Sequence, residues 1–155
     1  MGGNWIVMHE SMKITIRNAS LTDSGSVAEL TGQLGYQSDH RAIQERLGGL
    51  LEQEEDCVFV ALDTEKVVGW VHGFYSRRIE SEPFVEIGGL VVSGNYRNKG
   101  IAKLLVEEIY MWARTLACKK IRVRSNTIRK PAHGFYMKLG FEFEKEQKIF
   151  GKMLE

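Results

Sequence analysis

The sequence predicts one domain of the α/β class. Three successive segments, at 57–63, 67–75 and 84–92, are rich in the β-branched and aromatic residues that favour strands. The stretch 100–117 is apolar on nearly all sides, which is typical of a helix packed against a sheet. With 155 residues, 43% of them hydrophobic, the chain has enough apolar material for a single core.

Local signals give the order of the elements. Alternation at 13–18 predicts a short strand, after which Thr22 or Asp23 is the candidate N-cap of a helix. Ser38 or Asp39 is the candidate start of a second helix. The predicted elements are a strand at 13–18, helices at 22–34 and 38–53, strands at 57–63, 67–75 and 84–92, a helix at 100–117, a strand at 120–124, a helix at 131–139 and two strands in the tail.

Several classes of protein are excluded by what the chain lacks. No apolar run approaches the ~20 residues that span a bilayer, and the N-terminus has neither the basic segment nor the cleavage site of a signal peptide. Residues 1–11 are expected to be a loose extension of a domain at 12–155, in a cytoplasmic protein. Cys57 and Cys118 lie in apolar segments and are interpreted as reduced core thiols. The histidines are scattered, so no metal site is expected.

The net charge of +1 conceals two unlike halves. Residues 1–93 carry 7 Lys and Arg against 14 Asp and Glu, whereas residues 94–155 carry 14 against 6. This distribution indicates a surface that meets one anionic and one cationic partner.

The segment 90–103, LVVSGNYRNKGIAK, combines a strand end, a polar loop and a helix start. Backbone N–H groups at such a junction have no helical acceptor, and the helix dipole adds about half a positive charge. Arg97, Lys99 and Lys103 add full charges, and Gly100 lets the backbone approach a ligand. The segment is therefore a candidate pyrophosphate site. The alternative is a solvated basic turn, because neither a Walker A motif nor a three-glycine fingerprint is present.

Further motifs give this segment a family context. They are Leu90-x-Val92, Arg97-x-x-Gly100-x-Ala102, Asn126 and Ala132-x-x-Phe135-Tyr136-x-x-Leu139-Gly140-Phe141. In this order they resemble the GNAT family of acetyl-CoA-dependent N-acetyltransferases, over roughly residues 13–154. Ala102 stands where many members have Gly, and Gly94-Asn95 replaces the common Pro-Glu. The resemblance implies a mixed, mainly antiparallel sheet of about six or seven strands, flanked by about four helices and splayed between the family's fourth and fifth strands.

The resemblance also implies an acetyl-CoA site that releases coenzyme A. The backbone of Leu90 and Val92 would pair with the pantetheine arm like an added strand, and the amides of 97–102 would hold the pyrophosphate. Asn126 and the helix near Ala132 would line the other side of the arm. The implied cofactor residues are Leu90, Val91, Val92, Arg97, Asn98, Lys99, Gly100, Ile101, Ala102, Lys103, Asn126, Ala132, Tyr136 and Lys138.

Acetylation of an amine needs a base, because an alkylamine with a pKa near ~10.4 is almost wholly protonated at pH 7. Glu86 lies in the strand 84–92, and alternation places it on one face with Gly88, Leu90 and Val92. Its carboxylate is therefore a candidate general base, acting directly or through water. The alternative is an ordinary carboxylate on a half-exposed strand.

Two further catalytic roles come from the resemblance. Tyr136 matches the general acid that protonates the leaving thiolate, and helical spacing puts it at the margin of an apolar face. The alternative is an aromatic residue at the edge of the core. The N–H of Val92 would stabilise the oxyanion.

The acceptor is expected to be a small cationic amine, of aminoglycoside or polyamine type, that attacks directly in a ternary complex. The family's acceptor region maps here onto carboxylate and aromatic side chains, which suit a cation. These are Tyr36, Gln37, Asp39, Tyr75, Glu80 and Glu82, together with Glu86.

Other functions remain open from the sequence. Acetylation of a protein N-terminus or lysine uses the same core, and a non-catalytic acetyl-CoA sensor would keep the cofactor cleft without turnover. The basic half gives only weak support for a nucleic-acid-binding module, so no nucleic-acid partner is expected. No membrane partner is expected either, because the chain has no apolar run long enough to span a bilayer. A homodimer is compatible with such a fold.

Overall fold

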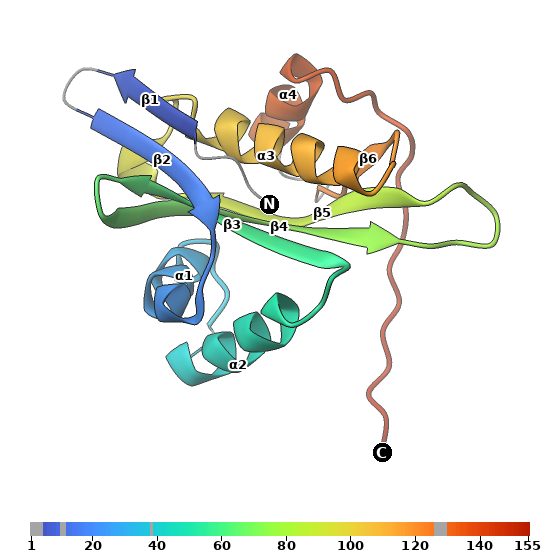
Figure 1. The fold of residues 1–155 in the computed structure, drawn as a ribbon. Helices are drawn as coiled ribbons and strands as arrows, with labels where there is room; N and C mark the ends of the chain where they lie inside the picture. Colours follow the sequence, from blue (N-terminus) through green and yellow to red (C-terminus); the bar gives the residue numbers. More distant parts are fainter. Residues whose placement is uncertain (1–4, 10–11, 38, 126–129) are drawn as a thin grey trace. The chain divides into compact units, whose positions relative to one another are not determined.

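The computed structural model describes residues 5–9, 12–37, 39–125 and 130–155 (Figure 1). The chain divides into two compact units, residues 1–124 and 125–155, and each is described by itself. The first unit contains β1 (Trp5–His9), β2 (Met12–Asn18), α1 (Ser24–Gly32), α2 (His40–Leu51), β3 (Asp56–Asp63), β4 (Lys66–Ser76), β5 (Phe84–Val92), α3 (Ile101–Thr115) and β6 (Ile121–Val123), with 3-10 turns at Leu21–Asp23 and Gly94–Tyr96; the second contains α4 (Lys130–Lys138).

The described strands form one mixed sheet in the order β1-β2-β3-β4-β5-β6. Neighbouring strands are antiparallel except β5 and β6, which are parallel. Helices α1 and α2 cover one face of the sheet, and α3 covers the other (Figure 1). The predicted α/β class is therefore confirmed, with a mixed, mainly antiparallel sheet and four helices among the described residues.

Most predicted elements begin and end close to their observed limits. The strand 84–92 is reproduced in full as β5. Asp39 is the N-cap of α2, where its carboxylate accepts a hydrogen bond of 2.7 Å from Ala42 N. Ser38, the other candidate start, lies outside the described residues. Asp23 directly precedes α1, but its carboxylate makes no capping bond to that helix.

The two ends of the chain differ from the predictions. Within the expected loose extension, Trp5–His9 forms β1, which pairs with β2 from Trp5↔Ile16 to His9↔Met12. This apolar segment meets the otherwise open edge of β2, which supplies partners for its backbone groups. The two predicted tail strands are wrong, because residues 141–155 form neither helix nor strand. The described part of the second unit contains no strand against which the tail could pair.

Both faces of the sheet are packed against helices. Under α1 and α2 lies a cluster of buried apolar residues, with Trp70 packed against it. On the other face, α3 lies so close that a Cβ on Gly73 of β4 would stand 2.8 Å from Ile109 Cδ1. Cys57 is buried in this layer, and burial raises the pKa of its thiol to about 12. It therefore stays a neutral thiol, as expected for a core residue.

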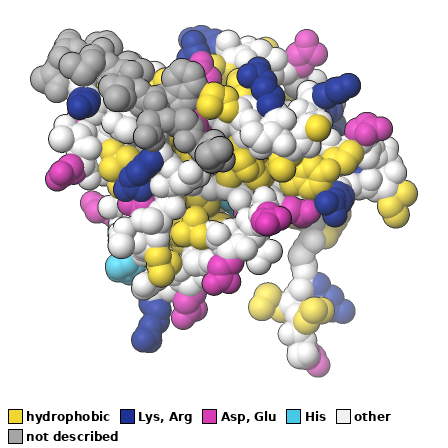
Figure 2. Space-filling view, in the orientation of Figure 1, with side chains coloured by type: hydrophobic (Ala, Val, Ile, Leu, Met, Phe, Trp, Pro, Cys, Tyr) yellow, Lys and Arg dark blue, Asp and Glu magenta, His cyan; other side chains and the backbone are white. Residues whose placement is uncertain are grey.

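The charge difference between the two halves of the sequence does not separate the charges on the face that Figure 2 shows. On the face drawn in Figure 2, acidic and basic side chains are intermingled. None of the helices in the described part of the chain is long and apolar enough to cross a bilayer.

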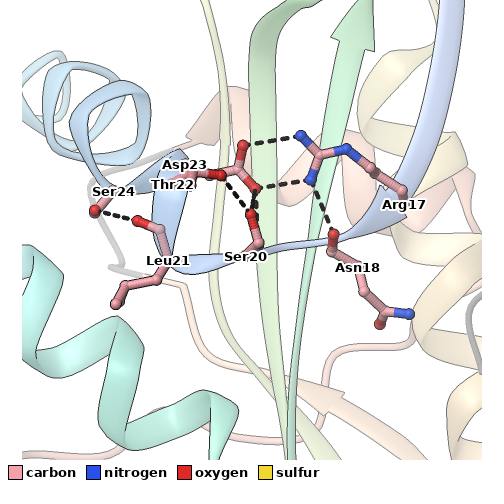
Figure 3. Close-up of polar contacts among 7 residues, drawn as sticks. All are labelled: Arg17, Asn18, Ser20, Leu21, Thr22, Asp23 and Ser24. Carbon is pink, nitrogen blue, oxygen red and sulfur yellow. Dashed lines mark hydrogen bonds and ion pairs between the residues drawn. The ribbon is translucent and has the colours of Figure 1, made fainter.

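An ion pair between the half-exposed Arg17 and the buried Asp23 fixes the junction between β2 and α1 (Figure 3). Asp23 is 5% exposed, and its two oxygens accept hydrogen bonds of 2.7 and 2.9 Å from the Arg17 guanidinium. Its Oδ2 also accepts from Ser20 N at 2.8 Å. Burial by itself raises the pKa of Asp23, but the hydrogen bonds from Arg17 and Ser20 outweigh burial, and the pKa is lowered. The charged carboxylate thus holds the start of α1 against the sheet.

Asp23→Ala is expected to lower the free energy of unfolding by about 2 kcal/mol at pH 7, because it removes charge-assisted hydrogen bonds. Since the pKa of Asp23 is lower in the folded state, this contribution is complete above the ordinary aspartate pKa and is lost as the pH falls through the lowered value. Urea unfolding from neutral to acid pH checks both points. The control Glu29→Ala, which removes an exposed carboxylate from α1, should change stability by less than about 0.5 kcal/mol. A difference that is constant with pH would contradict the role of the ionised carboxylate.

Candidate active site

One edge of β5 is unpaired over half of its length. β5 pairs with β4 along its whole length, from Ser76↔Phe84 to Gly69↔Val92. On its other edge it pairs with β6 only from Val85↔Ile121 to Ile87↔Val123. Among the described residues, no strand continues this pairing along 88–92. That edge therefore presents backbone groups that a ligand can use.

The amides of Leu90 and Val92 lie on the unpaired edge of β5. Ser93 N donates to Val68 O, so the backbone of residue 93 turns toward β4. Successive residues of a strand direct their backbone groups to opposite edges. Val92, and by the same alternation Leu90, therefore present N–H and C=O to the side that β6 leaves open.

A bulge in β5 lies beside this edge. The register passes from Gly73↔Ile87 to His72↔Gly89, so Gly88 is an extra residue without a partner on β4. A Cβ on Gly88 would stand 3.0 Å from His72 Nδ1, and a Cβ on Gly89 would stand 2.7 Å from Trp70 Cη2. Since His72 and Trp70 are on the same face of β4, both glycines face the layer of α1 and α2. A side chain at Gly89 would require the Trp70 ring to shift, and one at Gly88 would crowd the His72 ring.

The bulge overturns the predicted face of Glu86. Glu86 pairs with Phe74, which shares the α1 and α2 face with His72. Val92 pairs with Gly69, whose Cβ position lies 3.3 Å from Leu105 Cδ1 of α3. Glu86 and Val92 therefore lie on opposite faces, and by the same pairing so does Leu90. Simple alternation fails here because the extra residue shifts the period by one.

Glu86 is a buried carboxylate. It is 7% exposed, and its Oε1 accepts a hydrogen bond of 3.0 Å from Arg124 Nε, just beyond β6. The Arg124 side chain is 45% exposed, so the ion pair reaches the surface. The interpretation of Glu86 as an ordinary surface carboxylate is wrong, and its partner Arg124 was not anticipated from the sequence.

The loop before α3 combines left-handed residues, the first amides of a helix and exposed cations. Asn98 and Gly100 have left-handed backbone conformations, with φ of 62° and 81°. The first helical hydrogen bond of α3 joins Leu104 N to Gly100 O, so the amides of 101–103 precede the helical ladder. The side chains of Arg97, Lys99 and Lys103 are exposed around these amides, whereas Ile101 is buried and Ala102 is half-buried. The arrangement concentrates positive charge at a helix N-terminus.

Two hydrogen bonds attach this loop to the rest of the first unit. Tyr96 Oη donates to Asp63 Oδ2 at 2.7 Å, at the end of β3. This hydrogen bond raises the pKa of Tyr96. Gly94 N donates to Gln33 Oε1 at 3.3 Å, at the C-terminal end of α1. The basic loop is thus held between the β3–β4 hairpin and the end of α1.

The predicted acceptor residues are only partly brought together. A hollow of about 630 Å³ between α1 and α2 is lined by Gly32, Gly35, Tyr36, Gln37 and Asp39. Tyr75 is not beside them. It pairs with Val85 near the start of β5 and faces the α3 side, with Arg77 over its ring.

The remaining predicted site residues lie in the exposed loop after β4, in the second unit or outside the described residues. Glu80 and Glu82 are exposed in the loop after β4. Ala132, Tyr136 and Lys138 lie on α4 in the second unit, where the Tyr136 ring makes edge contacts with Phe135 and Phe141. Asn126 lies outside the described residues.

A histidine–aspartate pair that the sequence does not predict lies beside the bulge. His72 Nε2 lies 2.8 Å from Asp56 Oδ1, with the two side chains 20% and 19% exposed. Both face the α1 and α2 layer, beside the bulge. Extending the β3–β4 hairpin register back from its turn would place Asp56 and His72 on opposite faces, because the observed register shifts between Ala61 and Leu62. No three described His, Cys, Asp or Glu residues are grouped closely enough to hold a metal ion.

Gly100→Ala is expected to lower the free energy of unfolding by about 1 kcal/mol, because an L side chain is strained at φ 81°. No atom would lie within 4 Å of the added Cβ, so the cost is conformational rather than steric. Gly94→Ala is the matched control, since Gly94 has equal space but no left-handed conformation. Denaturant unfolding of the two variants checks this, and equal stabilities would contradict the requirement for glycine.

Comparison with known proteins places the chain among acetyltransferases. The sequence model of the acetyltransferase (GNAT) family matches residues 26–141. An aminoglycoside N(6')-acetyltransferase type 1 from Stenotrophomonas maltophilia is 27% identical over 90% of this chain and 92% of its own. An N-acetylaspartate synthetase from Xenopus tropicalis is 34% identical over 59% of this chain, but the match spans only 33% of that protein.

Solved structures show the same fold at lower sequence identity. The aminoglycoside N-acetyltransferase AAC(6')-Iy in complex with CoA superposes with a TM-score of 0.82 at 20% identity, covering 95% of this chain and 99% of that one. The aminoglycoside 6'-N-acetyltransferase AAC(6')-Ig from Acinetobacter haemolyticus has a TM-score of 0.80 at 18% identity, covering 90% and 99%.

Proposed function

The chain belongs to the acetyltransferase (GNAT) family, and from that premise we propose that it acetylates a primary amine of a small cationic molecule. It is an acyltransferase, and acetyl-CoA is its acetyl donor. The proposal concerns the acceptor and the residues that carry the reaction. The observation on which it rests most is the unpaired edge of β5, which continues into the basic loop before α3.

The geometry of this region fits acetyl-CoA. Bound there, acetyl-CoA supplies an activated acetyl group. The Leu90 and Val92 amides offer the pantetheine arm the hydrogen bonds of an added strand, and a splay of β5 from β6 beyond Ile87 would make room for it. The amides of 101–103 and the cations Arg97, Lys99 and Lys103 suit a pyrophosphate. By family resemblance, Asn126, Ala132 and Lys138 line the other side.

Each catalytic role is assigned to a residue of suitable chemistry. Glu86 accepts a proton from the amine, directly or through water, on the α1 and α2 face. The Val92 N–H stabilises the negative charge that develops on the carbonyl oxygen. Tyr136 donates a proton to the leaving sulfur, a role carried over from the family resemblance.

The acceptor class is supported by the hollow between α1 and α2. The exposed Tyr36 ring and the Asp39 carboxylate suit a cationic group. Several relatives that match over most of their length are named aminoglycoside N(6')-acetyltransferases, and aminoglycosides carry several amino groups. Acetylation of a protein N-terminus or lysine is the second candidate, and a non-catalytic acetyl-CoA sensor is the third.

Calorimetric titration with acetyl-CoA, followed by thiol release with a panel of amines, tests the proposal. We expect saturable binding, with stabilisation of about 2.7 kcal/mol at a ligand concentration 100 times Kd. Thiol release should be faster with aminoglycosides or polyamines than with peptides that present an N-terminus or lysine. Binding without turnover would favour the sensor, and faster turnover with peptides would favour the second candidate.

Glu86→Gln is expected to reduce kcat by about 100-fold, because the amide cannot accept a proton at neutral pH. Arg124→Gln is the matched control. It breaks the same 3.0 Å ion pair but keeps the carboxylate, and should reduce kcat by less than about tenfold. Steady-state kinetics with the best amine of the panel, at saturating acetyl-CoA, compare the two variants. Equal losses would show that Glu86 acts by holding Arg124 rather than by accepting a proton.

A further inference from the structure

The imidazole of His72 bridges three strands of the sheet on the α1 and α2 face. From β4, its Nε2 meets Asp56 Oδ1 of β3 at 2.8 Å. Its Nδ1 lies over the bulge of β5, 3.0 Å from the position that a Cβ on Gly88 would occupy. A side chain at Gly88 would crowd the ring in this position. The two ring nitrogens therefore have different surroundings.

The contact with Asp56 defines the chemistry of the ring. In the tautomer that suits an ionised Asp56, which only accepts hydrogen bonds, Nε2 is the donor in this contact. In the neutral imidazole this leaves Nδ1 as an acceptor, directed toward the bulge. If Nδ1 takes up a proton, the Asp56 carboxylate stabilises the resulting imidazolium. This arrangement of carboxylate, imidazole and open acceptor nitrogen is that of an oriented base.

The acceptor nitrogen of His72 faces an accessible part of the sheet. Gly88 is exposed although it lies in the middle of β5, next to the buried Ile87. Leu90, whose amide lies on the unpaired edge, is two residues further along, or about 7 Å. Glu86 lies on the same face of β5, two residues before Gly88. The side chains of His72 and Glu86 therefore lie on the same face of the sheet, both close to Gly88 of β5.

The acetylation of an ammonium group requires two proton removals. One proton leaves before the nitrogen can attack. The second leaves as the N–C bond forms and the C–S bond breaks, which gives the amide and coenzyme A. One of the two protons ends on the thiol and the other reaches solvent. The Glu86 carboxylate, whose Oε1 is paired with Arg124, can hold only one of them at a time.

We propose that His72, oriented by Asp56, is a second proton acceptor for the amine and carries one of its two protons to solvent. The inference rests on the proposed acetyltransferase function. Glu86 then takes the other proton, which returns to the leaving sulfur through the general acid. His72 is the catalytic residue of this pair, and Asp56 is its positioning residue.

Four variants test the proposal in the full-length protein, with the best amine of the panel. His72→Gln keeps an amide that can donate to Asp56 but removes the base, and should reduce kcat by about 100-fold while acetyl-CoA affinity changes less than twofold. In His72→Ala, added imidazole should restore part of the lost kcat. Asp56→Asn should reduce kcat by about tenfold, with no effect of imidazole. Glu55→Gln breaks an exposed ion pair to Arg77 one residue away and should change nothing.

The outcomes separate this inference from the proposed function. If the wild-type protein acetylates no amine, the proposed function fails, and the inference fails with it. If the wild-type protein is active and His72→Gln keeps kcat within threefold, only the inference is overturned. It is also overturned if kcat falls without rescue of His72→Ala by imidazole, or only together with a lowered melting temperature, because the pair is then structural.

Discussion

The extra residue in β5 is the constraint on which the arrangement of the site depends. Because Gly88 has no partner on β4, the side-chain period shifts by one at the middle of the strand. Upstream of the bulge, Glu86 faces α1 and α2; downstream of it, Leu90 and Val92 face α3 and direct their amides to an unpaired edge. A regular strand would place all three side chains on one face. The bulge instead places the Glu86 carboxylate on one face, and Leu90 and Val92, which contribute backbone amides to the proposed site, on the other.

The sequence predicts the elements of the fold well where local chemistry decides them. Alternation, turn residues and the N-cap of Asp39 give most boundaries within three residues. The face of Glu86 is mispredicted, because a pair of glycines does not reveal which of them is the extra residue. The pairing of Asp56 with His72 depends on a hairpin register that itself shifts between Ala61 and Leu62. Such errors arise where long-range pairing overrides local periodicity.

The uneven distribution of charge along the sequence appears in the structure as small groups of like charges. On the face drawn in Figure 2, acidic and basic side chains are mixed and do not form two poles. What persists is the group of cations at the start of α3 and the carboxylates around the α1 and α2 layer. Short-range fields of this kind act over about one Debye length, roughly 8 Å at physiological ionic strength. They suit recognition of a charged group at a site more than steering from a distance.

The hydrogen bond from Gly94 N to Gln33 Oε1 joins the basic loop to the residue that follows α1. Gln33 is followed by the segment that lines the hollow between α1 and α2. A displacement of either loop would break this bond, so a ligand that moved one loop would change the free energy of moving the other. Thermodynamic linkage would make such an effect mutual: any factor by which a ligand at the loop changed affinity at the hollow would equal the factor in the opposite direction. This amide contact is the route by which two such sites would be coupled.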